Sequence, residues 1–265
     1  MDIMGIFGLI MGVASIGVGM VLKGVSISAL NNPAAILIII AGTVSAVVIA
    51  TPGSELSLVG KLFGIMFGKV RTFITKEEVI EIMMGLAEVA RQEGILALEE
   101  RAKSIEEPFI VRGIQMLTDG ADSEYIASIL AADIDAMSER HATGAQIFMQ
   151  AGTYAPTLGV LGAVLGLIAA LSDLSNVEKI GHAISAAFVA TLLGIFTGYV
   201  LWFPMCNRLK RKSKQEVFVK GLMLEGIVGL SEGQNPRMLK DRLLTYVAAS
   251  ERAALDTDNK RGGKE

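Results

Sequence analysis

"GTYAPTLGVLGAVLGLIAAL", residues 152–171, contains no charged side chain over a length that can cross a membrane. The hydrocarbon core of a bilayer requires a helix of roughly 20 apolar residues. The first turns of this stretch nevertheless carry Thr153, Tyr154, Pro156 and Thr157. The stretch therefore predicts a membrane helix whose polar groups and proline require an explanation.

The rest of the chain is also unusually apolar. Of its 265 residues, 52% are hydrophobic, and the mean hydropathy of +0.53 exceeds that of ordinary soluble domains. Four stretches lack charged residues: Ile3–Leu22, 24–54, 142–172 and 183–207. The second and third hold one crossing each, at residues 34–50 and 152–171. We therefore expect an all-α integral membrane protein with four transmembrane helices, spread over residues 1–54 and 142–207.

The first apolar stretch is not typical of a cleaved signal peptide. It has no basic residues before its apolar run and no A-x-A site after it. We expect it to remain in place as the first crossing.

Basic residues predict the orientation in the membrane. The cluster "NRLKRKSK", residues 207–214, directly follows the fourth stretch, and Lys61, Lys69 and Arg71 follow the second. Basic flanks stay on the cytoplasmic side, and an even number of crossings then places both termini there. Lys23 after the first stretch argues for the opposite orientation, but the larger cluster decides.

Residues 55–141 are charged and periodic, which predicts a helical cytoplasmic domain between the second and third crossings. The pattern "TKEE" at residues 75–78 has capping-box spacing and marks a helix start. Further helices are expected at Pro108–Thr118 and at residues 123–140, and the latter should run on into the third crossing.

Residues 208–250, after the fourth crossing, are expected to form cytoplasmic C-terminal helices. The pattern of the fourth crossing continues to residue 230, Asn235 and Pro236 interrupt it, and a short helix is expected at residues 237–247. The polar tail at residues 251–265 is predicted to be disordered.

The four crossings lack the titratable residues that ion-moving bundles display. A charged side chain at mid-membrane costs about 2.5–3.5 kcal/mol and is kept for function, yet no Asp, Glu, Arg or His occurs in these stretches. If the protein handles ions, a partner must supply the titrating group. Thr191 stands out among the hydroxyls because it lies mid-span beside Ala187 and Gly194, although a hydroxyl can simply bond the carbonyl four residues earlier.

Small residues recur at four-residue spacing in the last two crossings. They are Ala186, Ala190, Gly194 and Gly198 in the fourth, and Gly162 and Gly166 in the third. Such spacing lets helices approach closely. Packing within the bundle and a channel wall between subunits fit the pattern equally.

Pro156 and Pro204 lie early in the third crossing and late in the fourth. Each removes a backbone hydrogen bond and is expected to kink its helix, with a static bend favoured over a hinge. Trp202 and Phe203 are most simply interpreted as part of an aromatic belt at the membrane boundary.

His141, His182 and Cys206 do not form a recognisable reactive or metal-binding site. The two histidines lie at opposite membrane boundaries, where a structural role is favoured over a proton relay. The single cysteine cannot form an internal disulfide and lacks the partners of a zinc site. The sequence predicts no catalytic residue, metal or cofactor, and shows no nucleic-acid-binding pattern.

The charge run "ARQEGILALEERAKSIEEP", residues 90–108, contains Arg91 and Glu99. Charges at helical spacing most often form a solvated helix face. Physical reasoning from the sequence alone does not single out two of them.

Several stretches together resemble the MotA/PomA family of flagellar motor stator A subunits, and most closely its MotA-type branch. They are "ARQEGILALE", "AGTYAPTLGVLGAVLGLIAALS", "GHAISAAFVATLLGIFTGYVLWFP" and "LKRKSKQE". They occur in the family's order, within four crossings and a large inner loop. The resemblance covers the chain from the first helix to about Val247.

This resemblance implies a function and its partners. Family members form an ion channel with a single-span B subunit of MotB type, whose membrane aspartate carries the ion, and five A subunits ring two B subunits. Ion flow then drives torque on the rotor protein FliG. We therefore expect a multi-pass stator subunit of the cell membrane, in contact with membrane lipids, and not an enzyme.

The resemblance also implies site residues. The torque-generating charges that face FliG fall on Arg91 and Glu99. The ion-path and partner-facing positions and the two coupling prolines fall on Thr191, Thr157, Ala163, Pro156 and Pro204. Sodium-using relatives carry a threonine where Ala163 stands, so protons are the expected ion.

Three other functions remain open at this point. A proton-driven energiser that resembles ExbB or TolQ would have three crossings, so a fourth at Ile3–Leu22 disfavours it. A self-contained secondary transporter would show inverted repeats and its own ion site. A passive scaffold would tolerate the loss of Arg91, Glu99 and Thr191.

Overall fold

The computed structural model describes residues 3–67, 74–172, 175–248 and 252. The described residues form helices and turns without a strand, which confirms the all-α class. The described residues do not include Lys69 or Arg71. They also do not include the tail predicted to be disordered, apart from Arg252.

The chain divides into two compact units. We call residues 1–70 and 140–212 the membrane unit, and residues 71–139 and 213–265 the extramembrane unit. Among the described residues, four helices are long and apolar enough to cross a membrane, as predicted.

The first two crossings lie at the N-terminal end of the membrane unit. The first crossing is α1 (Ile3–Leu22), and it is followed by a 3-10 turn, η1 (Ile27–Leu30). The second contains a widened π turn and consists of α2 (Pro33–Ile36), η2 (Leu37–Ala41) and α3 (Gly42–Ala50). Two short helices follow, α4 (Gly53–Leu56) and α5 (Val59–Phe67).

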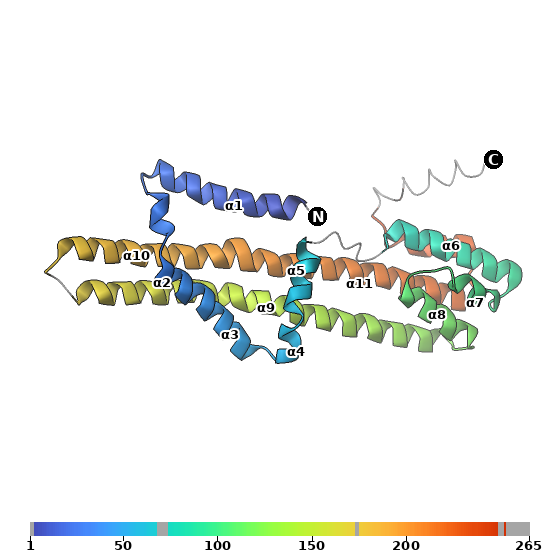
Figure 1. Ribbon diagram of the computed structural model, residues 1–265. Coiled ribbons are helices and arrows are strands. Elements are labelled where there is room, and N and C mark those ends of the chain that lie inside the picture. Colours follow the sequence, from blue (N-terminus) through green and yellow to red (C-terminus); the bar gives the residue numbers. More distant parts are fainter. Residues whose placement is uncertain (1–2, 68–73, 173–174, 249–251, 253–265) are drawn as a thin grey trace. The chain divides into compact units, whose positions relative to one another are not determined.

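The last two crossings belong to much longer helices. The third is the C-terminal part of α9 (Ser123–Leu171), a single helix of 49 residues. The fourth comprises α10 (Val177–Phe196) and the π turn η3 (Thr197–Trp202), and it continues into α11 (Phe203–Ser231). Figure 1 shows α9 running beside α10 in the membrane unit. The predicted continuity of both crossings with polar helical segments is therefore confirmed.

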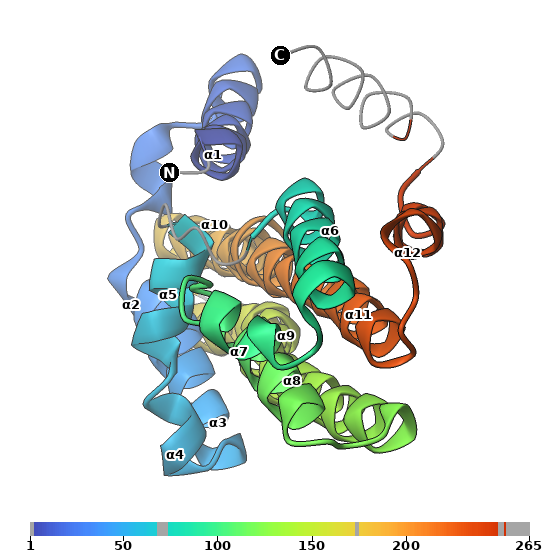
Figure 2. The same ribbon diagram turned by 90° about the vertical axis from the view of Figure 1, so that its right-hand side faces the viewer.

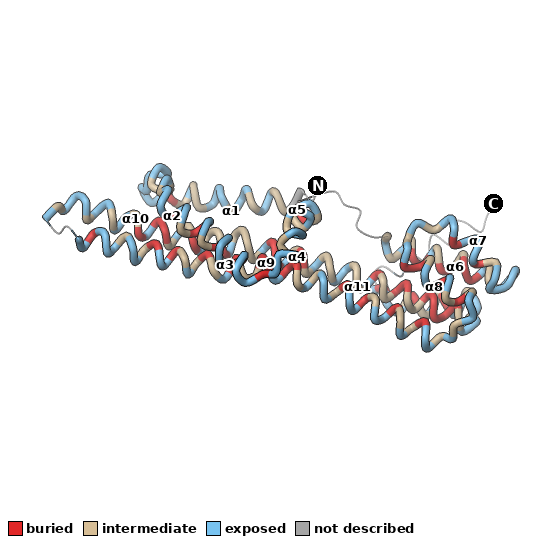
Figure 3. The backbone as a smooth tube through the Cα atoms, turned by 60° about the horizontal axis from the view of Figure 1, so that its bottom comes forward, coloured by how far each residue is buried: buried red, intermediate tan, exposed pale blue. Residues whose placement is uncertain are grey.

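The first crossing packs only lightly on the rest of its unit. In Figure 3 most of α1 is exposed or half-buried. Its glycines make the close contacts: a Cβ added to Gly12 would lie 2.6 Å from the side chain of Val200, and one added to Gly5 would collide with the guanidinium of Arg208. Most of its apolar side chains are left for lipid or for another chain to cover.

The extramembrane unit begins its described part with the predicted capping box. The amide of Glu78 donates to Thr75 Oγ1 at 3.2 Å, and the amide of Thr75 donates to Glu78 Oε2 at 2.8 Å. This exchange starts α6 (Lys76–Glu93), which is followed by α7 (Ala97–Ala102) and α8 (Pro108–Thr118). The bounds of α8 are those predicted from the sequence.

One hydrophobic core joins these helices to the N-terminal part of α9, the C-terminal part of α11 and α12 (Pro236–Leu244). Figure 2 shows α6, α8, α11 and α12 gathered in this unit. Its largest fully buried side chains are Met83, Leu86, Leu98, Ile110, Ile114, Ile126, Leu130, Leu222 and Met223. Asn235 caps α12, whose observed bounds differ slightly from the predicted 237–247.

Candidate functional site

The helices α9 and α10 meet backbone to backbone. A Cβ added to Gly159 would lie 2.9 Å from the Cα of Gly194 and from the carbonyl oxygen of Ala190. One added to Gly194 would lie 2.8 Å from the carbonyl oxygen of Ala155. A methyl group does not fit at either position, because backbone atoms cannot rotate aside.

The contact extends along both helices through further small residues. A Cβ at Gly162 would lie 3.2 Å from the Cβ of Ala190, and one at Gly166 would lie 3.2 Å from that of Ala187. We call this contact the glycine seam, lined by Gly159, Gly162, Gly166, Ala187, Ala190 and Gly194. Gly162, Gly166, Ala190 and Gly194 belong to the predicted pattern of small residues, and for these four the structure therefore selects packing within one chain.

Ala163 and Thr191 border the glycine seam at one level. Ala163 follows Gly159 by four residues and Thr191 follows Ala187 by four, so each lies one helical turn from a seam residue. The residues directly before them in the chain face each other across the seam. The structure thus brings together two of the predicted ion-path positions.

The second crossing packs on the opposite border of the seam. The side-chain amide of Asn32 donates to the carbonyl of Ala186 at 3.3 Å, and Ala35 shares a cluster with a seam alanine. Ala163 and Thr191 therefore lie on the border that the second crossing leaves uncovered. Both side chains are half-buried.

Thr157 does not join this pair within one chain. It lies two residues from Gly159, which turns its side chain by about 200° around the helix. The side chain of Thr157 is exposed on the far side of α9 from the seam.

The hydroxyl of Thr191 is bonded to its own helix and keeps its acceptor capacity. Thr191 Oγ1 donates to the carbonyl of Ala187 at 3.3 Å, and Thr157 Oγ1 donates likewise to the carbonyls of Thr153 and Tyr154. Because the only hydroxyl proton is used in this way, the oxygen lone pairs remain available. Thr191 can accept a hydrogen bond or contact a cation without disturbing the helix.

Pro156 lies inside α9 and contacts the fourth crossing. Its missing N–H removes the helical donor to the carbonyl of Gly152. A Cβ placed on Gly198 would lie 3.0 Å from that carbonyl oxygen and 2.8 Å from Pro156 Cγ. Glycine at residue 198 therefore lets η3 approach the proline closely.

Pro204 lies two residues after the end of the π turn η3, so its missing backbone donor lies close to a turn that is already widened. The helix changes from π to α geometry at Phe203, directly before this proline. The kink at each proline stays a prediction.

Trp202 is half-buried and packs against neighbouring helices, and its place in an aromatic belt at the membrane boundary stays a prediction. Its ring lies 6.4 Å from that of Phe148, and its Nε1 atom is buried. Trp202 also packs against clusters that include residues of the second crossing. Sequence reasoning missed this because apolar surroundings in lipid and in protein look alike in a hydropathy pattern.

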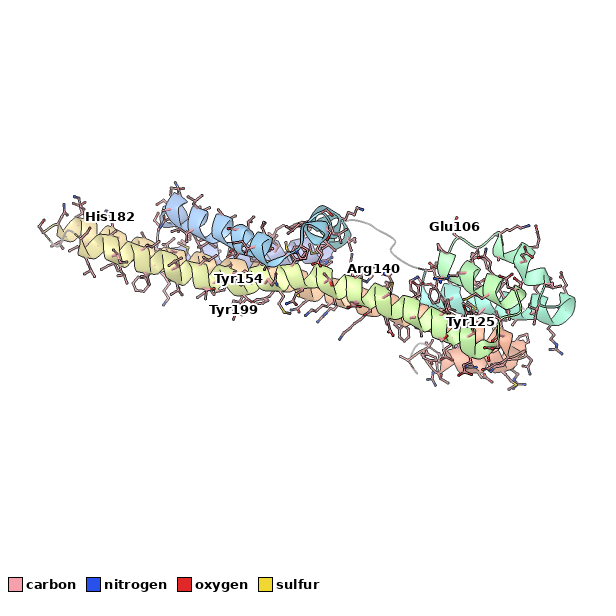
Figure 4. All side chains as sticks on the ribbon, turned by 90° about the horizontal axis from the view of Figure 1, so that it is seen from below. Glu106, Tyr125, Arg140, Tyr154, His182 and Tyr199 are labelled. Carbon is pink, nitrogen blue, oxygen red and sulfur yellow. The ribbon has the colours of Figure 1, made fainter. Side chains whose placement is uncertain are left out.

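The histidines and the cysteine form no chemical site with one another. Figure 4 places His182 near the beginning of α10, away from Tyr154 and Tyr199. Cys206 is a buried free thiol. Within the part of the chain that the structure describes, no group of three or more His, Cys, Asp or Glu side chains could hold a metal ion.

Arg91 and Glu99 lie on either side of a tight turn in the extramembrane unit. Arg91 is in the last turn of α6, Glu99 is in the first turn of α7, and Gly94 ends α6 with a φ of +90°. Both side chains are exposed, and neither forms an ion pair with a described residue. Glu100, in contrast, binds the ammonium of Lys103 at 2.5 Å and raises the pKa of that ammonium.

The same turn presents two apolar side chains that sequence reasoning missed. Ile95 is 41% exposed and Leu96 is 74% exposed. The turn is fixed because the amide of Ala97 donates to the carbonyl of Gly94 at 3.2 Å, and the fully buried Leu98 anchors α7 directly afterwards. The sequence contained a signal for this exposure. Gly94 ends a helix directly before Ile95 and Leu96, and such a turn can hold two large apolar side chains toward the solvent.

An acidic groove of about 600 Å³ lies on the same unit, between α6 and the segment after α7. Its charged lining consists of Glu78, Glu81, Glu106, Glu107 and Arg101, and Figure 4 labels Glu106. Glu107 already accepts from the ammonium of Lys220 at 3.4 Å. The remaining carboxylates give this face a negative charge.

Comparison with known proteins places these features in a family. Residues 101–220 match the model of the MotA/TolQ/ExbB proton channel family. The chain is 55% identical to Motility protein A of Bacillus subtilis over 252 residues, which are 95% of this chain and 93% of that protein.

Two solved structures share the whole fold. The chain is similar to a chain in the structure of the flagellar MotAB stator complex from Bacillus subtilis, with a TM-score of 0.88, 55% identity and coverage of 94% of this chain and 97% of that one. It is similar to a chain of C. jejuni MotAB at a TM-score of 0.88 and 31% identity, with the same coverage.

Proposed function

This chain belongs to the MotA branch of the MotA/TolQ/ExbB proton channel family, and on that premise we propose how it carries ions and transmits force as a flagellar stator subunit. The observation that supports the proposal is the uncovered border of the glycine seam, where Thr191 and Ala163 lie in apolar stretches, residues 152–171 and 183–207, that contain no Asp, Glu, Lys, Arg or His. Such a border can line an ion path but cannot carry the ion itself. A single-span B subunit with a membrane aspartate supplies the missing carboxylate.

The ion is a proton. Ala163 has no oxygen that could replace part of the hydration shell of sodium, and it lies level with the hydroxyl of Thr191 at the seam. One charge crossing the membrane releases about 2.3 kcal/mol per 100 mV. A few kcal/mol is enough to bias two arrangements of packed helices, with Pro156 and Pro204 as the coupling positions.

The active assembly contains five copies of this chain around two B subunits. One exposed face of α9, which includes Thr157, Val164 and Ile168, is left without a partner in the single chain. Neighbouring copies, the B subunit and membrane lipids cover such faces. Thr157 then contacts a neighbour rather than Thr191 of its own chain.

Both termini lie in the cytoplasm. The basic residues at 208–214 begin where the fourth crossing ends, and such clusters remain on the cytoplasmic side. A fluorescent protein fused to the C-terminus of the full chain should therefore fluoresce, whereas a fused alkaline phosphatase should be inactive. The reverse result would contradict this orientation.

Arg91 and Glu99 transmit force to the rotor protein FliG. They are exposed, oppositely charged and without an ion pair among the described residues. Leu96 lies between them on a fixed turn and adds an apolar contact. An apolar centre with a polar rim is typical of surfaces that bind a protein partner.

The decisive experiment measures swimming of motor-intact cells that lack their own stator genes. The cells receive this chain with its neighbouring B subunit, while a protonophore and external sodium are varied separately. We expect restored swimming that stops with the protonophore and does not respond to sodium. Failure to swim despite a correctly inserted complex would contradict the stator function, and a response to sodium would contradict the choice of ion.

The rotor surface is tested separately in the same cells. Arg91→Glu and Glu99→Lys should each reduce swimming strongly while the complex still inserts and conducts protons. Arg237→Glu is the matched control, because Arg237 is an exposed arginine at the start of α12. Equal losses in Arg91→Glu and Arg237→Glu would refute a specific role for Arg91.

A further inference from the structure

Thr43 carries a hydroxyl that is buried in the membrane unit without a partner. Thr43 is 1% exposed, and its Oγ1 atom has no hydrogen-bond partner among the described residues. In this it differs from Thr153, Thr157 and Thr191, whose hydroxyls donate to carbonyls of their own helices. Folded proteins rarely leave a buried polar group unsatisfied, so the hydroxyl of Thr43 requires a partner.

Trp202 carries a second group of this kind. Its Nε1–H is buried and has no acceptor within the described part of the chain. The indole N–H can only donate, so its partner must offer a lone pair. The ring is held in place because it packs against Phe148 and against three separate clusters of buried side chains.

The two groups belong to one junction of three helical segments. Thr43 lies four residues after Ile39 and four before Val47, so these side chains share one face of the second crossing. Trp202 packs against the cluster that contains Ile39 and against the cluster that joins Val47 to Ala151 of α9. We call this meeting point of α3, α9 and η3, marked by Thr43 and Trp202, the polar junction.

Both polar groups also lie at the ends of widened turns. The π turn η2 ends two residues before Thr43, and the π turn η3 ends at Trp202 itself. A π turn interrupts the regular backbone bonding of an α-helix and often marks a functional position. The chain thus places two irregular turns and two unpartnered polar groups at one junction.

We propose that the polar junction binds one water molecule, which accepts from Trp202 Nε1–H and is hydrogen-bonded to Thr43 Oγ1. Water supplies the lone pair that the indole needs and a further bond for the hydroxyl, which can donate or accept. Buried waters are held by two to four polar partners. Because the chain's own atoms cover both groups, no partner subunit reaches them. The water ties the second crossing to the turn that lies just before Pro204.

The single tryptophan makes the junction accessible to spectroscopy. Ultraviolet resonance Raman spectra are recorded on the complete complex with its B subunit, and the spectrum of a Trp202→Phe complex is subtracted to isolate this indole. The N–H band of the wild type should be that of a hydrogen-bonded indole. Thr43→Val preserves the shape and removes the hydroxyl, and it should shift the band to that of an unbonded N–H. Thr43→Ser restores a hydroxyl and should restore the wild-type band.

Thr197→Val is the matched control, because Thr197 lies in η3 and its hydroxyl already donates to the carbonyl of Leu193 at 2.9 Å. It should leave the indole band unchanged. A high-resolution electron cryomicroscopy map of the wild-type complex should show density within hydrogen-bond distance of both atoms. An unbonded band in the wild type, an unchanged band in Thr43→Val, or a direct bond between the two side chains without intervening density would each overturn the proposal. If Thr43→Val does not assemble, the wild-type band and map decide.

Discussion

The membrane unit and the extramembrane unit differ in how the helices inside each unit pack together. In the membrane unit, α9 and α10 meet at the glycine seam, where a Cβ on Gly194 would lie 2.8 Å from backbone atoms. In the extramembrane unit, large side chains such as Ile114 and Leu222 are fully buried in a shared core. The physical reason is that lipid surrounds the membrane unit, whereas water surrounds the extramembrane unit.

Lipid gives apolar side chains little reason to leave it, so membrane helices associate through close van der Waals contact between small residues. Water, in contrast, makes the burial of apolar surface favourable by about 25 cal/mol per Å². Adding a methyl group should therefore damage the membrane unit most. Removing methyl groups should damage the extramembrane unit most.

Gly194→Ala should have the largest effect. The added methyl meets the backbone of α9, which cannot move aside, so the helices must separate at a cost at or above the upper end of the 1–3 kcal/mol typical of overpacking. We expect loss of swimming and a sharply reduced yield of the complex in size-exclusion chromatography. Gly181→Ala on the same helix meets no atom within 4 Å and should behave as the wild type. Equal behaviour of the two variants would contradict close backbone packing as the basis of the membrane unit.

Leu239→Ala should have the next largest effect. Leu239 is fully buried in the core of the extramembrane unit, and its truncation leaves a cavity that costs about 2–3 kcal/mol. Hydrogen exchange of the intact complex, followed by mass spectrometry, should show faster exchange in α6 and α12. The neighbouring Met238 is 58% exposed, so Met238→Ala should change exchange little. A similar acceleration in both variants would argue against packing as the cause.

Thr75→Ala should have a smaller, local effect. It removes the oxygen that accepts from the amide of Glu78, and loss of such a cap costs about 1 kcal/mol. Hydrogen exchange should rise in the first turn of α6 and stay unchanged elsewhere. Ser128→Ala is the control, because this exposed hydroxyl bonds only its own helix. Unchanged protection at the start of α6 would show that the capping box is dispensable.

Gly226→Ala should have the smallest effect, because it tests crowding against a side chain instead of crowding against backbone. Its methyl would lie 2.6 Å from both Cγ and Sδ of Met83, which is as crowded as the seam, yet the obstacle is an unbranched side chain that can change rotamer rather than backbone. Alanine also favours a helix over glycine by about 0.8–1 kcal/mol. The opening free energy of α11, measured by hydrogen exchange, should therefore change by less than about 1 kcal/mol. A loss as large as that of Gly194→Ala would show that crowding alone, and not its backbone origin, decides the outcome.

The charged turn could be located from the sequence only through family resemblance. Charge spacing did not distinguish Arg91 and Glu99 from their neighbours. The fold distinguishes them from Glu100, which is bound by Lys103, whereas Arg91 and Glu99 form no ion pair with a described residue. It also exposes Leu96 beside them, which depends on how Gly94 ends α6.

The features that depend on neighbours along the chain could be predicted from the sequence alone. The crossing at Ile3–Leu22, the capping box that begins at Thr75 and the helix Pro108–Thr118 were all predicted and are present. Hydropathy over 20 residues, a cap and a proline in a first turn act within a few helical turns. Local interactions along the chain are therefore enough to predict these features without knowledge of how the helices pack.

Only the tertiary structure decided which side chain faces which helix. It directed four of the predicted small residues into a seam within the chain, set Thr191 apart from Thr157, and enclosed the Nε1 atom of Trp202. Their sequence patterns fit lipid, a neighbouring subunit or the chain itself equally well. The physical reason is that the packing of helices far apart in the sequence selects among these environments, and that selection is not encoded in any single segment.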